Sequence, residues 1–425
     1  MKAKLPVLLL IMLIVTNPKR ISAQDPAWVR DNTWFFDNFT KDTLSWDLFR
    51  ETFIGVAPAP SADFDGFFYD ALYQTKFAAP GLCYGMDVMA MLILKNGGHL
   101  GFCHPPYVYS GVGRPDDPNL ETAIEITHGN QINHGFLSFM LDVLAANELR
   151  NGNYAYLKVQ EFLSKDDQPV ICISGSQGGI TGDSGHVIVP YAIEQIGNTR
   201  KIYVYDPNRS YYVAGTDGKD FYDTHQNFIL INATTGSWSY LMAGSMGTWF
   251  GDPGSGGRIV AAPLSVVGKK DRLPQSLLAE GAIAINTILI YGNNVKVEQI
   301  TDLKSGRRLM NEKGNDIETH EDRRLKNVLP FISFAGIIPA SGKKGNAYFI
   351  RGNSQLDIQI RAFGDYKIGM MFNGKFKLIK GHGNGNIEHY NSPRLPTTVS
   401  HKKKISAPPI LLNNASKFNG SKHRP

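Results

Sequence analysis

The spacing of hydrophobic and polar positions changes several times between residues 80 and 206. Residues 84–95 are almost continuously apolar, contain good helix formers and are followed by two glycines, which predicts a buried helix. Residues 133–144 and 154–165 also have patterns typical of helices. Short runs rich in Val, Ile and Tyr predict three strands, of which the last two form a hairpin: residues 168–173, 185–194 and 201–206.

The pattern changes again after about residue 265. Short strand-like runs separated by Gly, Asn and Asp predict a small all-β domain over residues 265–380: residues 282–291, 295–301, 347–351, 356–361 and 366–379. Gly268–Arg272 has the composition of a linker, and residues 381–425 are expected to be a disordered tail. The chain is therefore predicted to be α+β, with a main domain over residues 24–264 and an appended β domain.

The amino terminus is typical of a secretory signal peptide. Lys2 and Lys4 precede an apolar run from Leu5 to Val15, and small residues near Ala23 suit a cleavage site. The run is too short to span a bilayer comfortably. We expect residues 1–23 to be removed and the mature protein to be secreted or extracytoplasmic, with no integral membrane span.

Charge argues against a nucleic-acid partner. The formal net charge is +6, but the last residues after Glu388 carry seven Lys or Arg and no acidic residue, so the rest of the chain is near neutral. A basic tail of this kind is typical of a solvated end, and no nucleic-acid-binding motif accompanies it. No His-Glu-x-x-His sequence occurs either, so neither a metal nor another cofactor is expected.

Cys83 is the first candidate for chemistry. It lies where a loop containing Pro80 and Gly81 meets the predicted helix, and unpaired N–H groups at a helix start favour the thiolate, which is the nucleophilic form. The other cysteines, Cys103 and Cys172, either form a disulfide that leaves Cys83 free or are reduced like it. A cysteine nucleophile also needs a base and a group that orients the base.

His186 and Asp206 can supply these two roles. His186 is early in one strand of the predicted hairpin and Asp206 ends its partner, so an antiparallel pairing brings them together. An oxyanion hole would combine the backbone N–H of Cys83 with a side-chain amide, for which Gln74 is the upstream candidate. Asn38-Phe39-Thr40 matches the acceptor sequence for N-glycosylation.

Three segments together resemble the papain-like cysteine peptidases. They are Gly81-Leu82-Cys83-Tyr84-Gly85-Met86, Gly185-His186-Val187-Ile188-Val189 and Tyr203-Val204-Tyr205-Asp206-Pro207-Asn208. The aspartate in the third position is similar to the compact branch that processes bacteriocin leaders. The distance from Cys83 to His186 is shorter than the roughly 130–150 residues typical of papain. The resemblance implies a papain-like fold, a Cys83-His186-Asp206 triad and a peptide or protein substrate, and it leaves the β domain unexplained.

Three alternatives remain. Gly182-Asp183-Ser184-Gly185 matches the serine motif of trypsin-like peptidases, but the upstream histidines lack the required context and the helices contradict a β-barrel. The same cysteine triad also serves transglutaminase or amidase chemistry, since an amine can resolve the acyl-enzyme as well as water. A non-enzymatic papain-like scaffold used for surface binding is the third.

Overall fold

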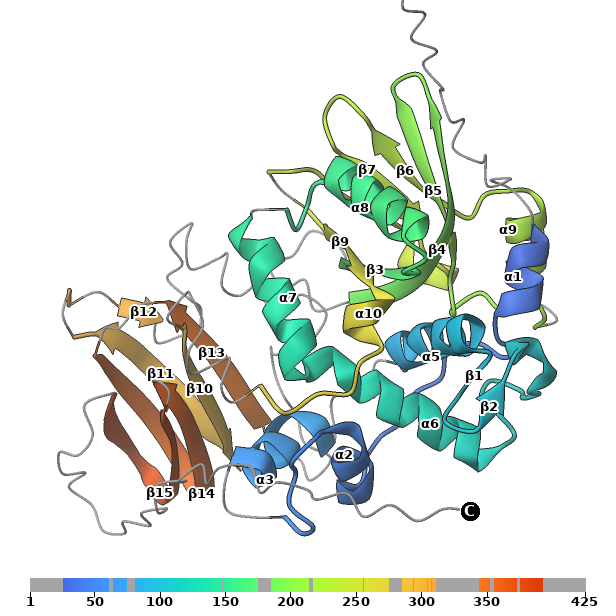
Figure 1. Ribbon diagram of the computed structural model, residues 1–425. Coiled ribbons are helices and arrows are strands. Elements are labelled where there is room, and N and C mark those ends of the chain that lie inside the picture. Colours follow the sequence, from blue (N-terminus) through green and yellow to red (C-terminus); the bar gives the residue numbers. More distant parts are fainter. Residues whose placement is uncertain are drawn as a thin grey trace, which may run out of the picture.

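The computed structural model describes residues 26–60, 64–74, 81–146, 148–174, 185–213, 217–254, 256–274, 285–292, 294–303, 305–306, 308–310, 344–351, 355–372 and 375–392. Within these ranges the chain is α+β, as the sequence predicts. Figure 1 shows a larger part with most of the helices and one sheet, and a smaller part made of a second sheet. The predicted signal peptide lies outside the described residues.

The helices belong to the larger part, and the predicted helices near residues 84–95, 133–144 and 154–165 are confirmed as α5, α7 and α8. The full set is α1 (Pro26–Asn32), α2 (Trp46–Thr52), α3 (Phe64–Phe68), the π-helix η1 (Tyr69–Tyr73), α5 (Cys83–Asn96), η2 (Pro106–Val108), α6 (Pro118–Gly129), η3 (Asn130–Ile132), α7 (His134–Ala145), α8 (Gly152–Ser164), α9 (Gly218–Asp223), η4 (Gly244–Met246) and α10 (Leu264–Val267). Across the described part of the chain, no helix has the length and apolar character needed to cross a membrane.

A seven-stranded sheet forms the framework of the larger part. Its strands are β3 (Pro169–Ser174), β4 (Gly185–Ile196), β5 (Thr199–Tyr205), β6 (Phe228–Asn232), β7 (Trp238–Leu241), β8 (Thr248–Gly251) and β9 (Arg258–Pro263). The order is β8-β7-β6-β5-β4-β3-β9, and all neighbours are antiparallel. A short separate hairpin joins β1 (Gly98–His99) to β2 (Phe102–Cys103). The three predicted strands are thus confirmed as β3, β4 and β5.

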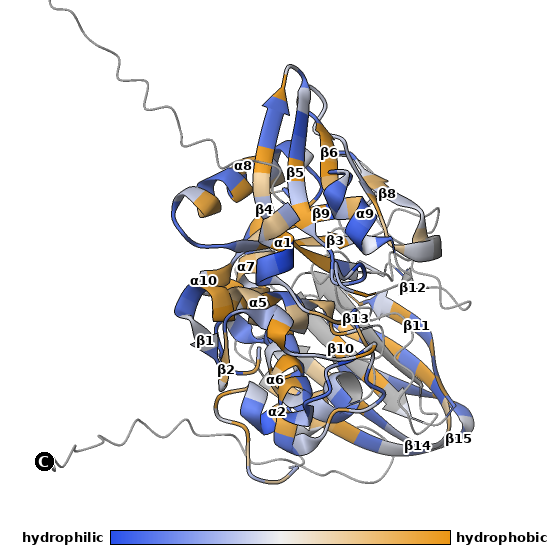
Figure 2. Cartoon of the chain, turned by 90° about the vertical axis from the view of Figure 1, so that its right-hand side faces the viewer, coloured by the Kyte–Doolittle hydropathy of each residue, from blue (hydrophilic) through white to orange (hydrophobic). Residues whose placement is uncertain are grey.

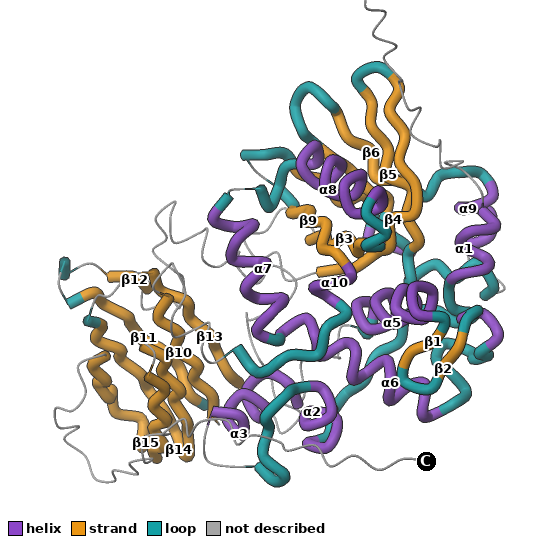
Figure 3. The backbone as a smooth tube through the Cα atoms, viewed as in Figure 1, coloured by secondary structure: helices purple, strands orange, loops and turns teal. Residues whose placement is uncertain are grey.

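The sheet separates two apolar cores. Successive side chains of a strand point to opposite faces, so Val187 and Val189 lie in the core that contains α5, and Ile188 lies in the core under α8. Figure 3 shows α8 lying across the strands. Burial on both faces explains why these strands lack polar alternation. In Figure 2 the far end of the β4–β5 hairpin is hydrophilic and the end near α5 is hydrophobic.

Helix α5 is held closely by its neighbours. It begins after Leu82 and ends at Gly97, whose left-handed φ of 72° suits a glycine cap. Gly85 lets α6 approach: a Cβ added there would lie 2.3 Å from the carbonyl oxygen of Ile124. The first turn of α5 therefore has a position fixed by backbone contact as well as by apolar packing.

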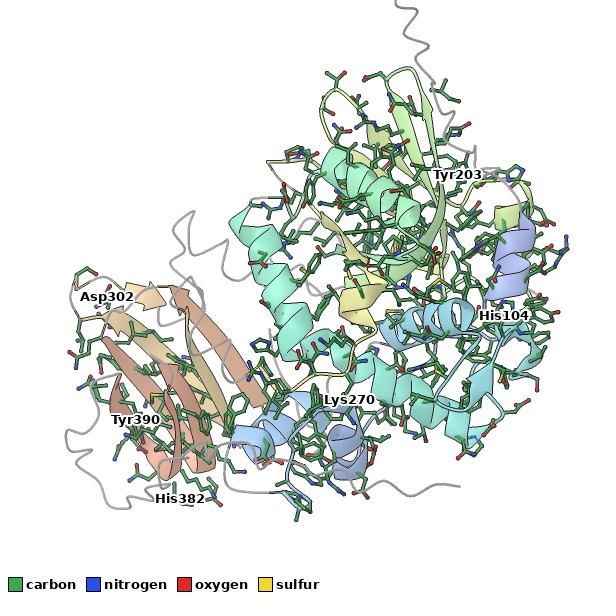
Figure 4. The ribbon with its side chains drawn as sticks, viewed as in Figure 1. His104, Tyr203, Lys270, Asp302, His382 and Tyr390 are labelled. Carbon is green, nitrogen blue, oxygen red and sulfur yellow. The ribbon has the colours of Figure 1, made fainter. Side chains whose placement is uncertain are left out.

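The predicted domain boundary after residue 264 is wrong. Leu264 and Val267 of α10 are buried in the core of the larger part, and the Tyr84 hydroxyl donates to the carbonyl oxygen of Val267 at 3.0 Å. The supposed linker is also bound, because the backbone N–H of His134 donates to the carbonyl oxygen of Arg272 at 2.9 Å. Residues up to about 273 belong to the larger part. Figure 4 labels Lys270 on this segment.

The smaller part is a second antiparallel sheet of order β12-β11-β14-β10-β13, with β15 also paired to β14. Its strands are β10 (Ile285–Gly292), β11 (Val295–Asp302), β12 (Arg308–Met310), β13 (Lys344–Arg351), β14 (Leu356–Phe372) and β15 (Lys375–Ser392). Figure 4 labels Asp302 and Tyr390 on this sheet. The predicted strands are confirmed in outline, but 356–361 and 366–372 belong to one long strand.

The predicted start of the tail at residue 381 is also wrong. Residues 381–392 continue β15. Glycines on this stretch leave room for side chains and backbone of β14, with which a larger residue would collide. A Cβ at Gly381 would meet the Tyr366 ring, and one at Gly383 would meet Ala362. The pattern of glycines that suggested flexibility therefore serves close packing. Residues 393–425 lie outside the described part.

The two parts contact each other through α3 and η1. The ring of Phe376 meets those of Phe64 and Phe67 at centroid distances of 5.3 and 5.7 Å, and Lys367 forms an ion pair with Asp70 at 2.8 Å. The contact joins β14 and β15 to the helical segment that ends at Gln74. The second sheet is thus packed against the larger part.

Candidate active site

Cys83 is the first residue of α5 and is half-buried. The loop before it is fixed by Asn38, whose Oδ1 accepts from the backbone N–H of Leu82 at 2.7 Å. The backbone N–H of Gly85 donates to Nδ1 of His128 at 3.4 Å. Among the described residues none accepts a hydrogen bond from the N–H of Cys83 itself. The thiol therefore lies at the positive end of the helix dipole beside a free donor.

His186 and Asp206 are brought together at the lower end of the β4–β5 hairpin. Nε2 of His186 lies 2.7 Å from Oδ1 of Asp206, and both side chains are almost fully buried. The second ring nitrogen, Nδ1, is thereby left for Cys83, whose side chain lies close enough to His186 to help raise the pKa of the imidazole. The thiol, the imidazole and the carboxylate thus form a continuous chain of contacts.

Electrostatics favour a charged imidazole in this chain. Burial lowers the pKa of His186, but the charge and hydrogen bond of Asp206, together with Cys83, outweigh it and raise that pKa well above its ordinary value. Burial raises the pKa of Asp206, yet the His186 charge and three hydrogen bonds bring it below its ordinary value. An imidazolium hydrogen-bonded to a carboxylate is the charge state that these two shifts favour.

Asp206 is oriented by groups from several elements. The Tyr240 hydroxyl of β7 donates to Oδ2 at 2.8 Å, and the backbone N–H of Asn208 donates to Oδ1 at 2.8 Å. The backbone N–H of Asp206 donates to the hydroxyl of Tyr222 in α9 at 2.9 Å. Its carboxylate is therefore fully engaged, with one oxygen directed at His186 and the other at Tyr240.

Gln74 lies at the end of η1, half-buried, and its backbone carbonyl oxygen accepts from Leu44 at 2.8 Å. No contact within the described ranges joins its side chain to Cys83, His186 or Asp206, so its part in an oxyanion hole stays a prediction. Asn38 instead has a side-chain amide bound to the residue just before Cys83, through the N–H of Leu82. Its Nδ2 donates to Oδ1 of Asn208 at 2.9 Å.

Asp87 is the unexpected member of the site. It lies one helical turn after Cys83 on α5, is fully buried, and neither carboxylate oxygen has a hydrogen-bond partner in the described structure. Burial, and then the Cys83 charge, raise the pKa of Asp87 well above its ordinary value, although His186 opposes this. Its surroundings therefore favour the neutral acid, and a charge on Asp87 would disfavour a negative charge on Cys83.

The other cysteines do not form the considered disulfide. Cys103 is exposed on β2, Cys172 is buried on β3, and all three cysteines are free. Burial raises the pKa of Cys172 far above its ordinary value, so it is an inert core thiol. Ser184 of the serine-peptidase motif lies outside the described residues. In the described ranges no group of three or more His, Cys, Asp or Glu side chains is arranged to hold a metal.

The sequence pattern does not indicate the roles of Asp87 and Tyr240, and it indicates Asn38 only as a glycosylation acceptor. For Asp87 a signal was present, since an acidic residue inside an otherwise apolar helical run is buried only at a cost that function can justify.

Comparison with models of known families, with curated proteins and with solved structures finds no match. The chemistry must therefore be argued from the site. A thiol at a helix start, a buried imidazole and an orienting carboxylate can together activate a sulfur nucleophile and then protonate a leaving group.

Proposed function

We propose that this chain is a cysteine peptidase with a papain-like catalytic domain, exported from the cytoplasm by its amino-terminal segment. The observation that carries the proposal is the contact chain from Cys83 through His186 to Asp206. The use of Nε2 for the carboxylate, which leaves Nδ1 for the thiol, supports it, as does the order Cys, His, Asp along the chain. The substrate would be a peptide or protein.

The reaction follows from the charge state of the site. The Cys83 thiolate attacks the carbonyl carbon of an amide and forms a C–S bond, while the carbonyl oxygen takes the negative charge near the N–H of Cys83. The C–N bond then breaks, and His186 gives its Nδ1 proton to the leaving amine. Water attacks the resulting thioester as His186 takes its proton, and the acid product leaves with the thiolate restored.

Two other outcomes are open to the same site. An amine in place of water would make the protein a transglutaminase, and hydrolysis of an amide other than a peptide bond would make it an amidase. The triad alone does not distinguish these reactions. A binding scaffold without turnover is the non-enzymatic alternative. The buried and fully hydrogen-bonded Asp206 favours catalysis, because orienting a histidine by a desolvated carboxylate has a cost that a binding surface does not require.

The test is active-site labelling of the mature protein. A peptidyl electrophile that alkylates thiolates should label wild type at pH 6, where ordinary thiols of pKa about 8.5 are mostly protonated. Labelling should map to Cys83, disappear in Cys83→Ala, and persist in the control Cys103→Ala. Turnover should be abolished in Cys83→Ala and nearly so in His186→Ala, with a residual rate in Asp206→Ala.

If Cys83 is accessible in wild type and is not labelled, the hypothesis that Cys83 is the nucleophile is refuted. Labelling without turnover of any peptide or amine acceptor would favour the binding scaffold. Ser184→Ala should have no effect, and its inactivation beside an active Cys83→Ala would establish the serine alternative.

A further inference from the structure

Two arginines lie side by side at the edge of the seven-stranded sheet. Arg258 begins β9, and Arg150 lies on the loop between α7 and α8. The backbone N–H of Ile259 donates to the carbonyl oxygen of Leu149 at 2.8 Å, which fixes the two segments next to each other. The positive charge of Arg150 acts on Arg258, so the guanidinium groups are close enough to repel.

Within the described ranges neither arginine forms an ion pair, although the charge of Asp252 lies near Arg150. Both arginines are partly buried, the Nε of each is buried without an acceptor, and none of the ion pairs in the described structure includes either residue. Burial, and then the Arg150 charge, lower the pKa of Arg258 to about 10. Burial lowers the pKa of Arg150, and Asp252 opposes this from nearby. Like charges kept together with unsatisfied donors are unfavourable unless an anion binds them.

The arginine pair lies at the same end of the sheet as His186. Ser174 of β3 pairs with Arg258 on one side and with Gly185 on the other. Adjacent strands are about 4.8 Å apart, so the backbone of Arg258 lies about 10 Å from that of Gly185, the neighbour of His186. Alternation along β9 puts Arg258 on the face of Val260, which belongs to the core that contains α5. His186 pairs with Ile173 and begins on the other face, so a substrate that reaches both would pass over this end of the sheet.

That distance suits an extended substrate. A peptide residue spans about 3.3–3.6 Å, so about three residues separate the arginine pair from the catalytic histidine. Guanidinium groups bind carboxylates through paired, charge-assisted hydrogen bonds. We propose that Arg150 and Arg258 form a subsite for a substrate carboxylate, about three residues from the bond that Cys83 attacks. This inference rests on the proposed peptidase function. The carboxylate comes either from an Asp or Glu side chain or from the peptide carboxyl terminus.

The first experiment measures substrate preference in the full-length mature protein. Fluorogenic peptides carry Glu or Gln at each position around the scissile bond, each with a free or an amidated carboxyl terminus. We expect kcat/KM to be about tenfold or more higher for a carboxylate at one position. That preference should fall to near unity in Arg258→Gln and Arg150→Gln. Amidation removes the preference only if the terminal carboxylate is the ligand.

The matched control is Arg200→Gln. Arg200 is also half-buried, but it is already bound to Gln195 and Asn153, at the opposite end of the hairpin. Its loss should leave the preference unchanged. An equal preference in wild type and in both subsite variants would overturn the proposal.

The second experiment does not depend on turnover. Glutarate at constant ionic strength should raise the Tm of Cys83→Ala, and should raise it much less in Cys83→Ala/Arg258→Gln. If glutarate raises the Tm in a way that depends on Arg258 but no peptide is cleaved, the carboxylate subsite is supported and the peptidase function is refuted. Cleavage without carboxylate preference and without a glutarate shift would refute the subsite and keep the peptidase.

Discussion

Replacement of Gly85 by alanine should destabilise the protein and weaken the site at once. The new Cβ would lie 2.3 Å from the carbonyl oxygen of Ile124 and 2.8 Å from the Cβ of His128. Ordinary contacts begin near 3.4 Å, so the first turn of α5 must move away from α6 by about 1 Å. Backbone cannot rotate aside as a side chain can, so the strain falls on the helix that carries Cys83.

The magnitude follows from three contributions. Overpacking against backbone costs about 3 kcal/mol, and loss of the bond from the Gly85 N–H to His128 costs about 1 kcal/mol. The better helix propensity of alanine returns about 1 kcal/mol. The net destabilisation is therefore about 3 kcal/mol, or roughly 6–12 °C in Tm for a domain of this size. A displacement of 1 Å at the nucleophile can also reduce kcat/KM about 100-fold.

The assay is urea unfolding followed by circular dichroism, with Cys83 labelling rates measured on the same samples. The control is Gly135→Ala near the start of α7, where the new Cβ would meet only the side chains of Asp271 and Asn133, at 3.1 and 3.6 Å. That variant should be neutral or slightly more stable. The reasoning is refuted if Gly85→Ala is as stable as Gly135→Ala, or if it loses stability and labels at the wild-type rate.

Two further variants test the buried charges. Because the pKa of Asp87 is raised in the folded state, this group makes wild type less stable as pH rises above about 4, and Asp87→Asn removes that contribution. The free energy of unfolding of Asp87→Asn relative to wild type, measured with urea, should rise by up to about 1.4 kcal/mol per pH unit. A difference between the two proteins that does not change with pH would contradict this. Tyr240→Phe should cost about 1.5–3 kcal/mol at pH 7 through the lost bond to Asp206. Because the Asp206 pKa is lowered, that cost should persist down to about pH 4 and shrink only below the shifted pKa, so a cost that already falls between pH 7 and about pH 4 would disagree.

Elements with one dominant local pattern could be predicted from the sequence. The apolar run before Gly97 gave α5, and the three Val- and Ile-rich runs gave β3, β4 and β5, since burial on both faces leaves a continuous apolar signal. Domain boundaries that depend on tertiary contacts could not be predicted from the sequence. Val267 follows Pro263 and precedes a charged segment typical of a linker, yet its carbonyl oxygen accepts from Tyr84, far away in the sequence.

Glycine was misleading for a related reason. A glycine-rich segment has no apolar pattern, which is typical of a flexible tail. At Gly381 and Gly383, however, β14 packs so closely that a Cβ would collide with it. Their meaning depends on the partner strand, and the partner is known only once the hairpin has formed. The same reasoning applies to Arg150 and Arg258, which are far apart in the sequence and meet through a single backbone hydrogen bond between their neighbours.

Asn38 shows how the site is held together outside the sheet. Its backbone N–H donates to the carbonyl oxygen of Pro207 at 2.7 Å, its Nδ2 donates to Asn208, and its Oδ1 accepts from Leu82. One residue thus ties the turn after Asp206 to the loop before Cys83. A glycan on its Nδ2 would replace one of the two N–H groups and crowd the bond to Asn208, so we expect the acceptor sequence to remain unmodified in the folded site. The spacing of thiol and carboxylate is therefore set by direct bonds from the amino-terminal segment, which no local pattern around Asn38 could indicate.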